Sequence, residues 1–128
     1  QAVYFTHGGC GFYHAVVQIK KKMEGTAKNA ILATFAAFPS LKMVIAVDED
    51  VDITDAEDVE WALATRFRPD TGMIQIPAAR GHELNPSTDR GLGMKLGIDA
   101  TAPYPRPQAF ERVKMAAVDL AAFDIQKG

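Results

Sequence analysis

The stretch MVIAVDEDVDITDAEDVEWALATRFRP, residues 43–69, decides how this chain is expected to fold. It opens with a continuous apolar run, Met43 to Val47, which has the length and composition of a strand covered on both faces. Eight carboxylates follow within thirteen residues. A helical repeat of apolar residues over 54–67 overlaps the last of them and ends near two arginines. A buried strand that leads into an amphipathic helix is typical of an α/β fold.

The acidic cluster at residues 48–60 has three interpretations. A calcium loop of the EF-hand type starting at its first residue would need glycine and glutamate where the sequence has Ile53 and Val59, so that reading fails. A T-x-x-E capping box made by Thr54 and Glu57 explains about half of the acids as helix-start chemistry. The remaining acids follow the carboxyl end of a buried strand, where open α/β sheets hold ligands. A direct metal site there stays the less favoured alternative.

Strand-like and helix-like segments alternate along the rest of the chain. Strands are expected over 2–7, 14–22 and 72–78, and helices over 25–38 and from 108 to about 125. Residues 80–107 are rich in glycine and proline with little periodicity, so we expect an extended functional or interfacial loop there. The prediction is a single α/β domain over residues 1–128. It is three-layer-like, with a mostly parallel or mixed sheet flanked by helices.

The net charge and the cysteine content limit which partners and which cellular compartment are expected. The formal net charge of −2 gives no support to a nucleic-acid or anionic-membrane partner. Cys10 is the sole cysteine, so no intrachain disulfide can form, and a reducing, cytoplasmic compartment is expected. The longest apolar run is far shorter than the ~20 residues that span a bilayer, so no membrane span is expected. The chain begins at Gln1 without methionine, which suggests that it is cut from something longer.

The segment HGGCGFYH, residues 7–14, offers a possible metal set of His7, Cys10 and His14, or a phosphate-binding glycine loop. A structural metal site needs a fourth ligand, which this set lacks. A phosphate loop requires a following helix, whereas this segment leads into a strand. A nucleophilic Cys10 is less favoured still, because only the histidines could lower its pKa. A hairpin-like connection between two strands is the preferred interpretation.

A second glycine-bearing segment, RGLGMKLGIDAT at residues 90–101, has Gly91, Gly93 and Gly97 around Lys95. Glycines let backbone approach a ligand or partner closely, and a lysine among them can bind an anion. No strand precedes the segment in the way that a dinucleotide-binding fingerprint requires. An irregular loop that closes over the domain is the favoured interpretation.

Taken together, VDEDVDITDAEDVEWALATRFRPD, PAARGHELNPS and GLGMKLGIDAT resemble the C-terminal domain of the UbiD-type decarboxylases. Members of that family carry an apolar strand that runs into D-[DE]-D-[IV]-[DN], then a D-V-x-W-A-x-x-T-R helix and a proline. Here these motifs are residues 48–52, residues 58–66 and Pro69. The upstream AVVQIKKKMEGTAKNAI is similar to the strand and helix that precede the motif in the family. The resemblance therefore covers nearly the whole chain, and it makes the acids a structural strand-to-helix junction.

The resemblance implies part of an enzyme that adds or removes carbon dioxide on aromatic or α,β-unsaturated acids with prenylated FMN. The modified flavin supplies the electron sink that protein side chains lack. The family's catalytic Arg and Glu, and the ligands of its Mn²⁺ or Mg²⁺ and K⁺, belong to an N-terminal flavin-binding domain that nothing here matches. We therefore expect no catalytic residue, no metal ligand and no activity in this chain alone. Its expected partner is a flavin-binding domain or subunit.

The family's active site lies between its two domains, and the resemblance places His82, Leu84 and Ser40 on the substrate-pocket wall. A histidine can hydrogen-bond a ring hydroxyl, so a phenolic, hydroxybenzoate-like acid is the expected substrate. A solvent-facing loop histidine is the open alternative. Lys95 is expected to approach the flavin phosphate, as a cofactor-binding residue, or a neighbouring subunit.

The expected last helix corresponds to a family segment that packs between protomers, so a homo-oligomer is expected. Two other functions stay open. The chain could be a non-catalytic oligomerisation or regulatory module of the same ancestry, or an unrelated small α/β ligand-binding domain, which the matched motifs disfavour. A native reading frame that continues upstream into a flavin-binding domain would distinguish a decarboxylase domain from the non-catalytic module.

Overall fold

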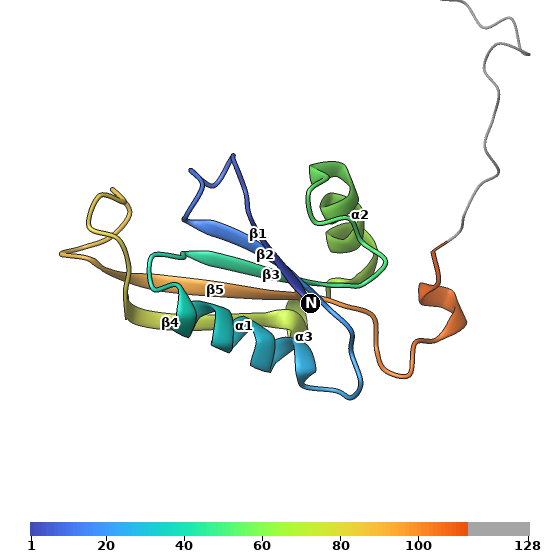
Figure 1. Ribbon diagram of the computed structural model, residues 1–128. Coiled ribbons are helices and arrows are strands. Elements are labelled where there is room, and N and C mark those ends of the chain that lie inside the picture. Colours follow the sequence, from blue (N-terminus) through green and yellow to red (C-terminus); the bar gives the residue numbers. More distant parts are fainter. Residues whose placement is uncertain (113–128) are drawn as a thin grey trace, which may run out of the picture.

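The computed structural model of the protein describes residues 1–112. They form one five-stranded sheet with a helix on each face (Figure 1). The elements in chain order are β1 (Ala2–Phe5), β2 (His14–Ile19), α1 (Thr26–Ala37), β3 (Met43–Asp48), α2 (Ala56–Arg66), α3 (Pro69–Gly72), β4 (Met73–Arg80), β5 (Leu92–Ala100) and the 3₁₀ turn η1 (Gln108–Phe110). Within the described residues, no helix is long and apolar enough to cross a membrane.

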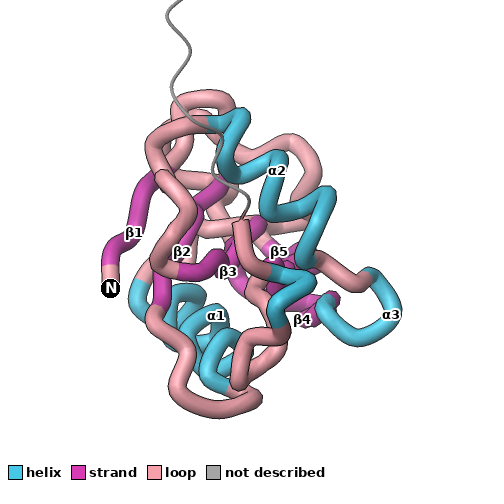
Figure 2. Tube along the Cα trace, turned by 90° about the vertical axis from the view of Figure 1, so that its right-hand side faces the viewer, coloured by secondary structure: helices cyan, strands magenta, loops and turns pink. Residues whose placement is uncertain are grey.

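The sheet is mixed, with strand order β1-β2-β3-β5-β4. The three inner strands β2, β3 and β5 run parallel, whereas β1 and β4 lie antiparallel at the two edges. In the view turned by 90°, α1 and α2 lie on opposite sides of the strands, so the domain has three layers (Figure 2). The predicted α/β class, with a mostly parallel or mixed sheet flanked by helices, is confirmed.

The central strand β3 feeds two separate hydrophobic cores. Its Val44 and Ala46 belong to the core under α1, and its Ile45 and Val47 belong to the core under α2. Both faces of a strand are buried only when helices cover both sides, which is why its sequence is continuously apolar rather than alternating. Burial of each of the Val and Ile side chains contributes roughly 1.5–3 kcal/mol through loss of water-exposed area.

Strand β5 corrects the prediction of a loop over residues 80–107. Residues 92–100 are an interior strand, paired parallel to β3 and antiparallel to β4. A Cβ placed on Gly97 would lie 2.6 Å from Cγ2 of Ile31 on α1. Glycine is therefore needed where the helix crosses the strand closely, and the glycines that suggested a loop instead allow this packing.

The start of α2 also differs from the predicted capping box. The N-cap is Asp55, whose side chain accepts a hydrogen bond from the backbone N–H of Glu57 (3.0 Å). The hydroxyl of Thr54 instead donates to Oδ1 of Asp52 (2.7 Å). The hydrogen bond to the charged carboxylate holds the Thr54 side chain at Asp52. The next residue, Asp55, therefore caps the helix.

The predicted hairpin-like connection at residues 7–14 is confirmed, since β1 and β2 pair antiparallel on either side of it. At the other end of the chain, residues 101–112 form an extended strap, here called the C-terminal strap, whose one regular element is η1. The described residues therefore begin no α-helix at Gln108. The remainder of the helix predicted to about residue 125 lies outside the described residues, as does the oligomer contact expected of it.

Candidate functional site

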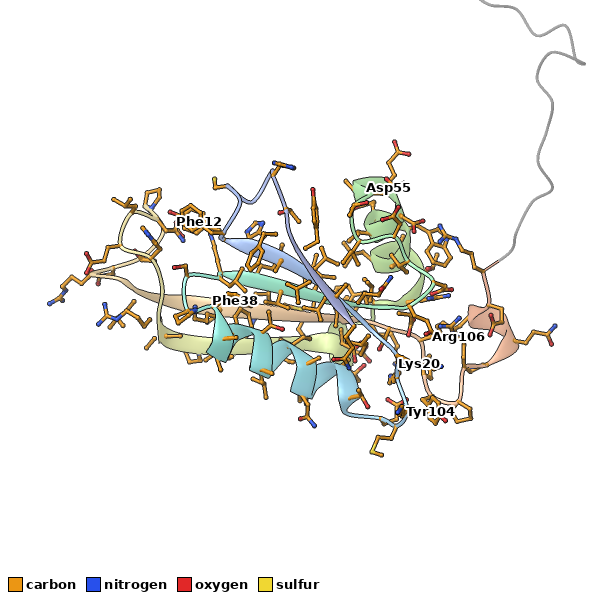
Figure 3. All side chains as sticks on the ribbon, viewed as in Figure 1. Phe12, Lys20, Phe38, Asp55, Tyr104 and Arg106 are labelled. Carbon is orange, nitrogen blue, oxygen red and sulfur yellow. The ribbon has the colours of Figure 1, made fainter. Side chains whose placement is uncertain are left out.

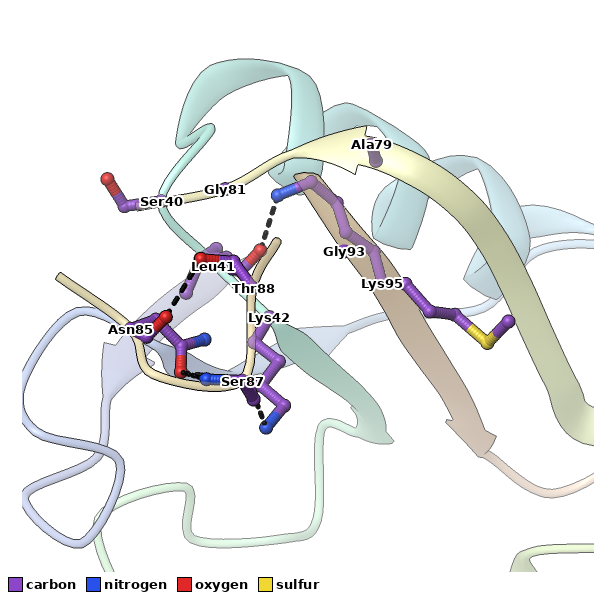
Figure 4. A pocket seen from close by; sticks show the side chains of 11 residues that line it. Ser40, Leu41, Lys42, Ala79, Gly81, Asn85, Ser87, Thr88, Gly93 and Lys95 are labelled. Carbon is purple, nitrogen blue, oxygen red and sulfur yellow. Dashed lines mark hydrogen bonds between the residues drawn. The ribbon is translucent and has the colours of Figure 1, made fainter. Parts of the chain in front are cut away.

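Three segments meet at the amino end of β3 and enclose a pocket of about 180 Å³ (Figure 4). They are the turn around Ser40 that joins α1 to β3, the loop over residues 81–91 between β4 and β5, and the first part of β5. We call this hollow the lysine pocket because Lys42 and Lys95 both line it.

Lys95 fixes one wall of the lysine pocket from within the sheet. Its side chain is buried, with 7% exposure, and its Nζ donates to the carbonyl oxygens of Pro39 (2.6 Å) and Leu41 (2.5 Å). These carbonyls flank Ser40, so the ammonium group holds the Ser40 turn on both sides. Burial lowers the pKa of Lys95, because the charged form loses water.

The loop between β4 and β5 is folded by Asn85. Its side-chain oxygen accepts from the backbone N–H of Ser87 (3.1 Å) and from the Ser87 hydroxyl (2.8 Å), and its carbonyl accepts from the hydroxyl of Thr88 (2.8 Å). Nζ of Lys42 donates to the same Ser87 hydroxyl (3.1 Å) and connects the loop to the start of β3. The N-P-S-T sequence is a signal for such an Asx-type turn.

The four predicted site residues fall into two groups. Ser40 and Lys95 come together in the lysine pocket. His82 and Leu84 are not among the residues that line it, although they belong to the same loop. Leu84 is 78% exposed, so its side chain projects away from the described core.

His82 packs against the β1–β2 hairpin rather than against the pocket. Its ring centroid lies 5.1 Å from that of Phe12 and 6.1 Å from that of Tyr13. Its Nδ1 accepts from the backbone N–H of Leu84 (3.1 Å), which assigns the proton of the neutral ring to Nε2. The hairpin contact and the Leu84 bond orient the imidazole, and they leave Nε2–H as its donor.

An apolar hollow of about 300 Å³ adjoins the lysine pocket and shares Ser40 with it. Phe12 and Phe38 border this hollow and are 39% and 42% exposed. Both lie at one end of the domain, opposite Arg106 and Tyr104 (Figure 3). Exposed aromatic side chains around a hollow are typical of a surface that another protein segment or an apolar ligand covers.

The acidic cluster lies at the carboxyl end of β3, and Arg66 organises it. Nη1 of Arg66 donates to Asp48 (2.9 Å) and to Asp50 (2.8 Å), and Nη2 donates to the second oxygen of Asp50 (2.9 Å). The bond from Arg66 lowers the pKa of Asp50, whereas burial raises the pKa of Asp48. These acids therefore act as partners for a buried guanidinium group.

The C-terminal strap is bound to the same acids. Arg106 pairs with Asp50 (3.2 Å), and the backbone N–H of Ala102 donates to Asp48 (2.9 Å). Further along, Arg112 pairs with Asp58. Within residues 1–112, no three His, Cys, Asp or Glu side chains are arranged to hold a metal ion.

Comparison with known proteins identifies the class. The family model described as the 3-octaprenyl-4-hydroxybenzoate carboxy-lyase C-terminal domain matches residues 1–100. The chain belongs to this family, the C-terminal domain of the UbiD-class enzymes.

Individual relatives support the same assignment. A Rhodospirillum rubrum protein from the cooM 5′ region is 58% identical over 96% of this chain and 27% of its own length. The anhydromevalonate phosphate decarboxylase of Archaeoglobus fulgidus is 51% identical over 84% of the chain and 25% of its own length. The gallate decarboxylase of Lactiplantibacillus plantarum is 39% identical over 91% and 26%, respectively. The chain thus spans about a quarter of the length of these relatives.

A solved structure agrees with the fold. The UbiD-class enzyme HmfF from Pelotomaculum thermopropionicum, in complex with FMN, superimposes with a TM-score of 0.87. It is 42% identical and covers 94% of this chain, which in turn covers 28% of HmfF.

The residues that line the lysine pocket fit only part of a flavin. The lysine pocket, at about 180 Å³, is smaller than the roughly 300–1,000 Å³ of sites that enclose a cofactor. Its lysines and hydroxyl groups match a phosphate group rather than an isoalloxazine ring. The lysine pocket can therefore bind and orient an anionic group.

Proposed function

We propose that this chain forms one wall of the substrate pocket in a UbiD-class decarboxylase whose flavin and catalytic groups lie on a separate flavin-binding domain or subunit. The observation that carries the proposal is the fixed arrangement of the Ser40 turn and the loop over residues 81–91. Lys95 holds the Ser40 turn and Asn85 folds the neighbouring loop, which leaves a shaped, open surface next to an apolar hollow. A wall that is rigid yet open on one side is what a cavity shared between two domains requires.

Decarboxylation leaves electron density on an sp² carbon, and prenylated FMN supplies the sink for it when it is bound. The residues of this chain would exclude water and orient the acid. Nε2–H of His82 is the donor available for a ring hydroxyl, which supports a phenolic, hydroxybenzoate-like substrate. Ser40 and Leu84 would complete the wall, one polar and one apolar.

Substitution of His82 by Phe in the complete enzyme tests this proposal. The loss of one donor to a substrate hydroxyl costs about 1–3 kcal/mol, so kcat/KM for a hydroxybenzoate should fall roughly 5- to 150-fold. Turnover of an acrylic-type acid, which has no hydroxyl, should be unchanged. The neighbouring Glu83→Gln variant serves as the control on the same loop. Equal loss on both substrate classes would contradict the assignment.

A second substrate class has a specific observation in its favour. The anhydromevalonate phosphate decarboxylase is 51% identical to this chain, whereas the gallate decarboxylase is 39% identical. A phosphorylated α,β-unsaturated acid is therefore the alternative to a phenolic acid. Release of CO₂ from anhydromevalonate phosphate and from hydroxybenzoates, measured side by side with the complete enzyme, distinguishes the two.

A non-catalytic oligomerisation or regulatory module of the same family is the other candidate. A flavin-binding domain encoded upstream in the same reading frame would support the catalytic proposal, and its absence from the operon would favour the module. We propose a homo-oligomer as the assembled form. Light scattering at micromolar concentration tests it, and a monomer from the complete enzyme would contradict it.

A further inference from the structure

We propose that the lysine pocket is a binding site for a phosphate monoester, in which Lys95 supplies the buried positive charge and Lys42 a second charge at the rim. The existence of the site is independent of the proposed function. The source of the phosphate, either the substrate or the flavin, rests on that function.

The first observation is a buried charge without a counter-charge. Lys95 is 7% exposed, yet none of the ion pairs within residues 1–112 includes it. Its partners are two neutral carbonyl oxygens and the ring of Phe35, 5.5 Å from Nζ. Burial of an ammonium group is costly unless it is paired. Two of its three donors are used, so one remains for a ligand.

Arg66 shows by contrast how this fold treats a buried cation that has only a structural role. It is 3% exposed and is paired with both Asp48 and Asp50. Lys95, at the opposite end of the sheet, has no such carboxylate within the part of the chain that the structure describes. The contrast indicates that the counter-charge of Lys95 comes from outside these residues.

The remaining lining residues suit an anion. Among the described residues that line the pocket there is no carboxylate, and Lys42, Ser40 and Asn85 add one charged and two neutral donor groups. Gly81 and Gly93 leave the wall open, since a Cβ on either would come no closer than 3.5 Å to any side chain and would then meet Thr88. An anion can therefore approach backbone as well as side chains.

The size of the pocket selects the ligand. Its volume of about 180 Å³ equals that of roughly six water molecules at ~30 Å³ each, which accommodates a phosphate group and the first atoms of its ester chain. It does not accommodate a flavin ring system. A bound dianion would also oppose the effect of burial on the pKa of Lys95 and would strengthen its hold on the Ser40 turn.

The experiment titrates this chain with inorganic phosphate and with butyl phosphate, followed by ¹⁵N–¹H NMR. Backbone signals of Ser40, Asn85 and Lys95 should shift together and saturate. Lys95→Met should weaken binding at least tenfold, and Lys28→Met, which removes an exposed lysine on α1, should leave it unchanged. Shifts spread over surface lysines, or equal affinity of the Lys95→Met chain, would overturn the proposal.

Gly93→Ala keeps the test decisive if Lys95→Met does not fold. The added methyl group meets Thr88 Cγ2 at 3.5 Å, an ordinary contact, so the chain should fold while the pocket becomes smaller. Phosphate affinity should fall at least fivefold. Unchanged affinity in this folded variant would place the anion elsewhere and overturn the site.

The complete enzyme then separates the two sources of phosphate. If the pocket holds the substrate phosphate, butyl phosphate should inhibit CO₂ release competitively and Lys95→Met should raise KM with little change in flavin content. If it holds the flavin phosphate, Lys95→Met should lower flavin retention instead. Either result supports a phosphate site. The absence of both would refute a role of the lysine pocket in phosphate binding by the complete enzyme. Failure of the decarboxylase proposal would appear separately, as no CO₂ release by the unmodified enzyme.

Discussion

Replacement of Gly97 by alanine should destabilise the domain by about 1–2 kcal/mol. The new methyl group would lie 2.6 Å from Cγ2 of Ile31 and 3.3 Å from Cβ of Ile74. Ile31 is fully buried on α1, so it cannot swing away into solvent, and the helix must move. Overpacking of this kind costs about 1–3 kcal/mol, and the lower flexibility of alanine in the unfolded chain offsets about 0.4–1 kcal/mol of it.

Gly93→Ala is the matched control, on the same strand and the same face. Its methyl group would meet only Thr88 Cγ2, at 3.5 Å, so stability should be unchanged or raised by up to about 1 kcal/mol. The two variants should therefore differ by roughly 2 kcal/mol, or about 6–10 °C in Tm for a domain of this size.

Urea unfolding monitored by circular dichroism measures the difference. The midpoint for Gly97→Ala should fall while the m-value stays that of the parent. In a double-mutant cycle, Ile31→Ala should make room for the methyl group, so the loss from Gly97→Ala should shrink in that background. Equal stability of the Gly97→Ala and Gly93→Ala chains would refute the close packing of α1 on β5.

Three further predictions concern α2 and its acids. Arg66→Met should cost about 3–5 kcal/mol in urea unfolding at pH 7, because it removes the buried cation that pairs with Asp48, whose side chain is only 5% exposed. A loss below about 1 kcal/mol would contradict the buried pairing. Asp55→Ala should cost about 1 kcal/mol and Thr54→Ala less than half of that, measured by thermal melts, because Asp55 caps the helix; the reverse order would restore the capping box. The pKa of Asp50 is lowered in the folded state from 3.8, so its contribution to stability is present above that value and is lost as the pH falls through the folded pKa. Between about pH 5 and pH 2 the Asp50→Asn chain should therefore lose less stability than the parent, and parallel losses in the two urea series would contradict the assignment.

The elements that carry local signals could be predicted from the sequence. The continuous apolar run of β3 and the helical periodicity of α1 and α2 arise from burial on a sheet, and this burial leaves its period in the sequence. Strand β5 has its signal too, since Leu92, Met94, Leu96 and Ile98 alternate at period two. The intervening glycines concealed it, because the need for Gly97 comes from a helix more than sixty positions away in the chain.

Of the residues proposed from the resemblance, Ser40 and Lys95 line the lysine pocket, whereas Lys42 and Asn85, which also line it, were not predicted. Lys95 reaches the carbonyl oxygens on either side of Ser40 only because residues 92–100 form a strand, which was not predicted from the sequence. Arg66 was missed as a structural residue, although it lies four positions after Ala62 and seven after Val59, which places it on the same buried stripe of α2. A charged residue on an apolar stripe is a signal that a buried partner exists.

The C-terminal strap sets where this unit can be separated from its surroundings. The family match stops at residue 100, but Asp48 and Asp50 take donors from Ala102 and Arg106 beyond that point. A fragment trimmed to the matched boundary would leave Asp48 and Asp50 without these donors and should unfold at a lower urea concentration. A transplant of this domain onto a related enzyme should therefore extend through Arg112, so that it includes the arginines that pair with Asp50 and Asp58.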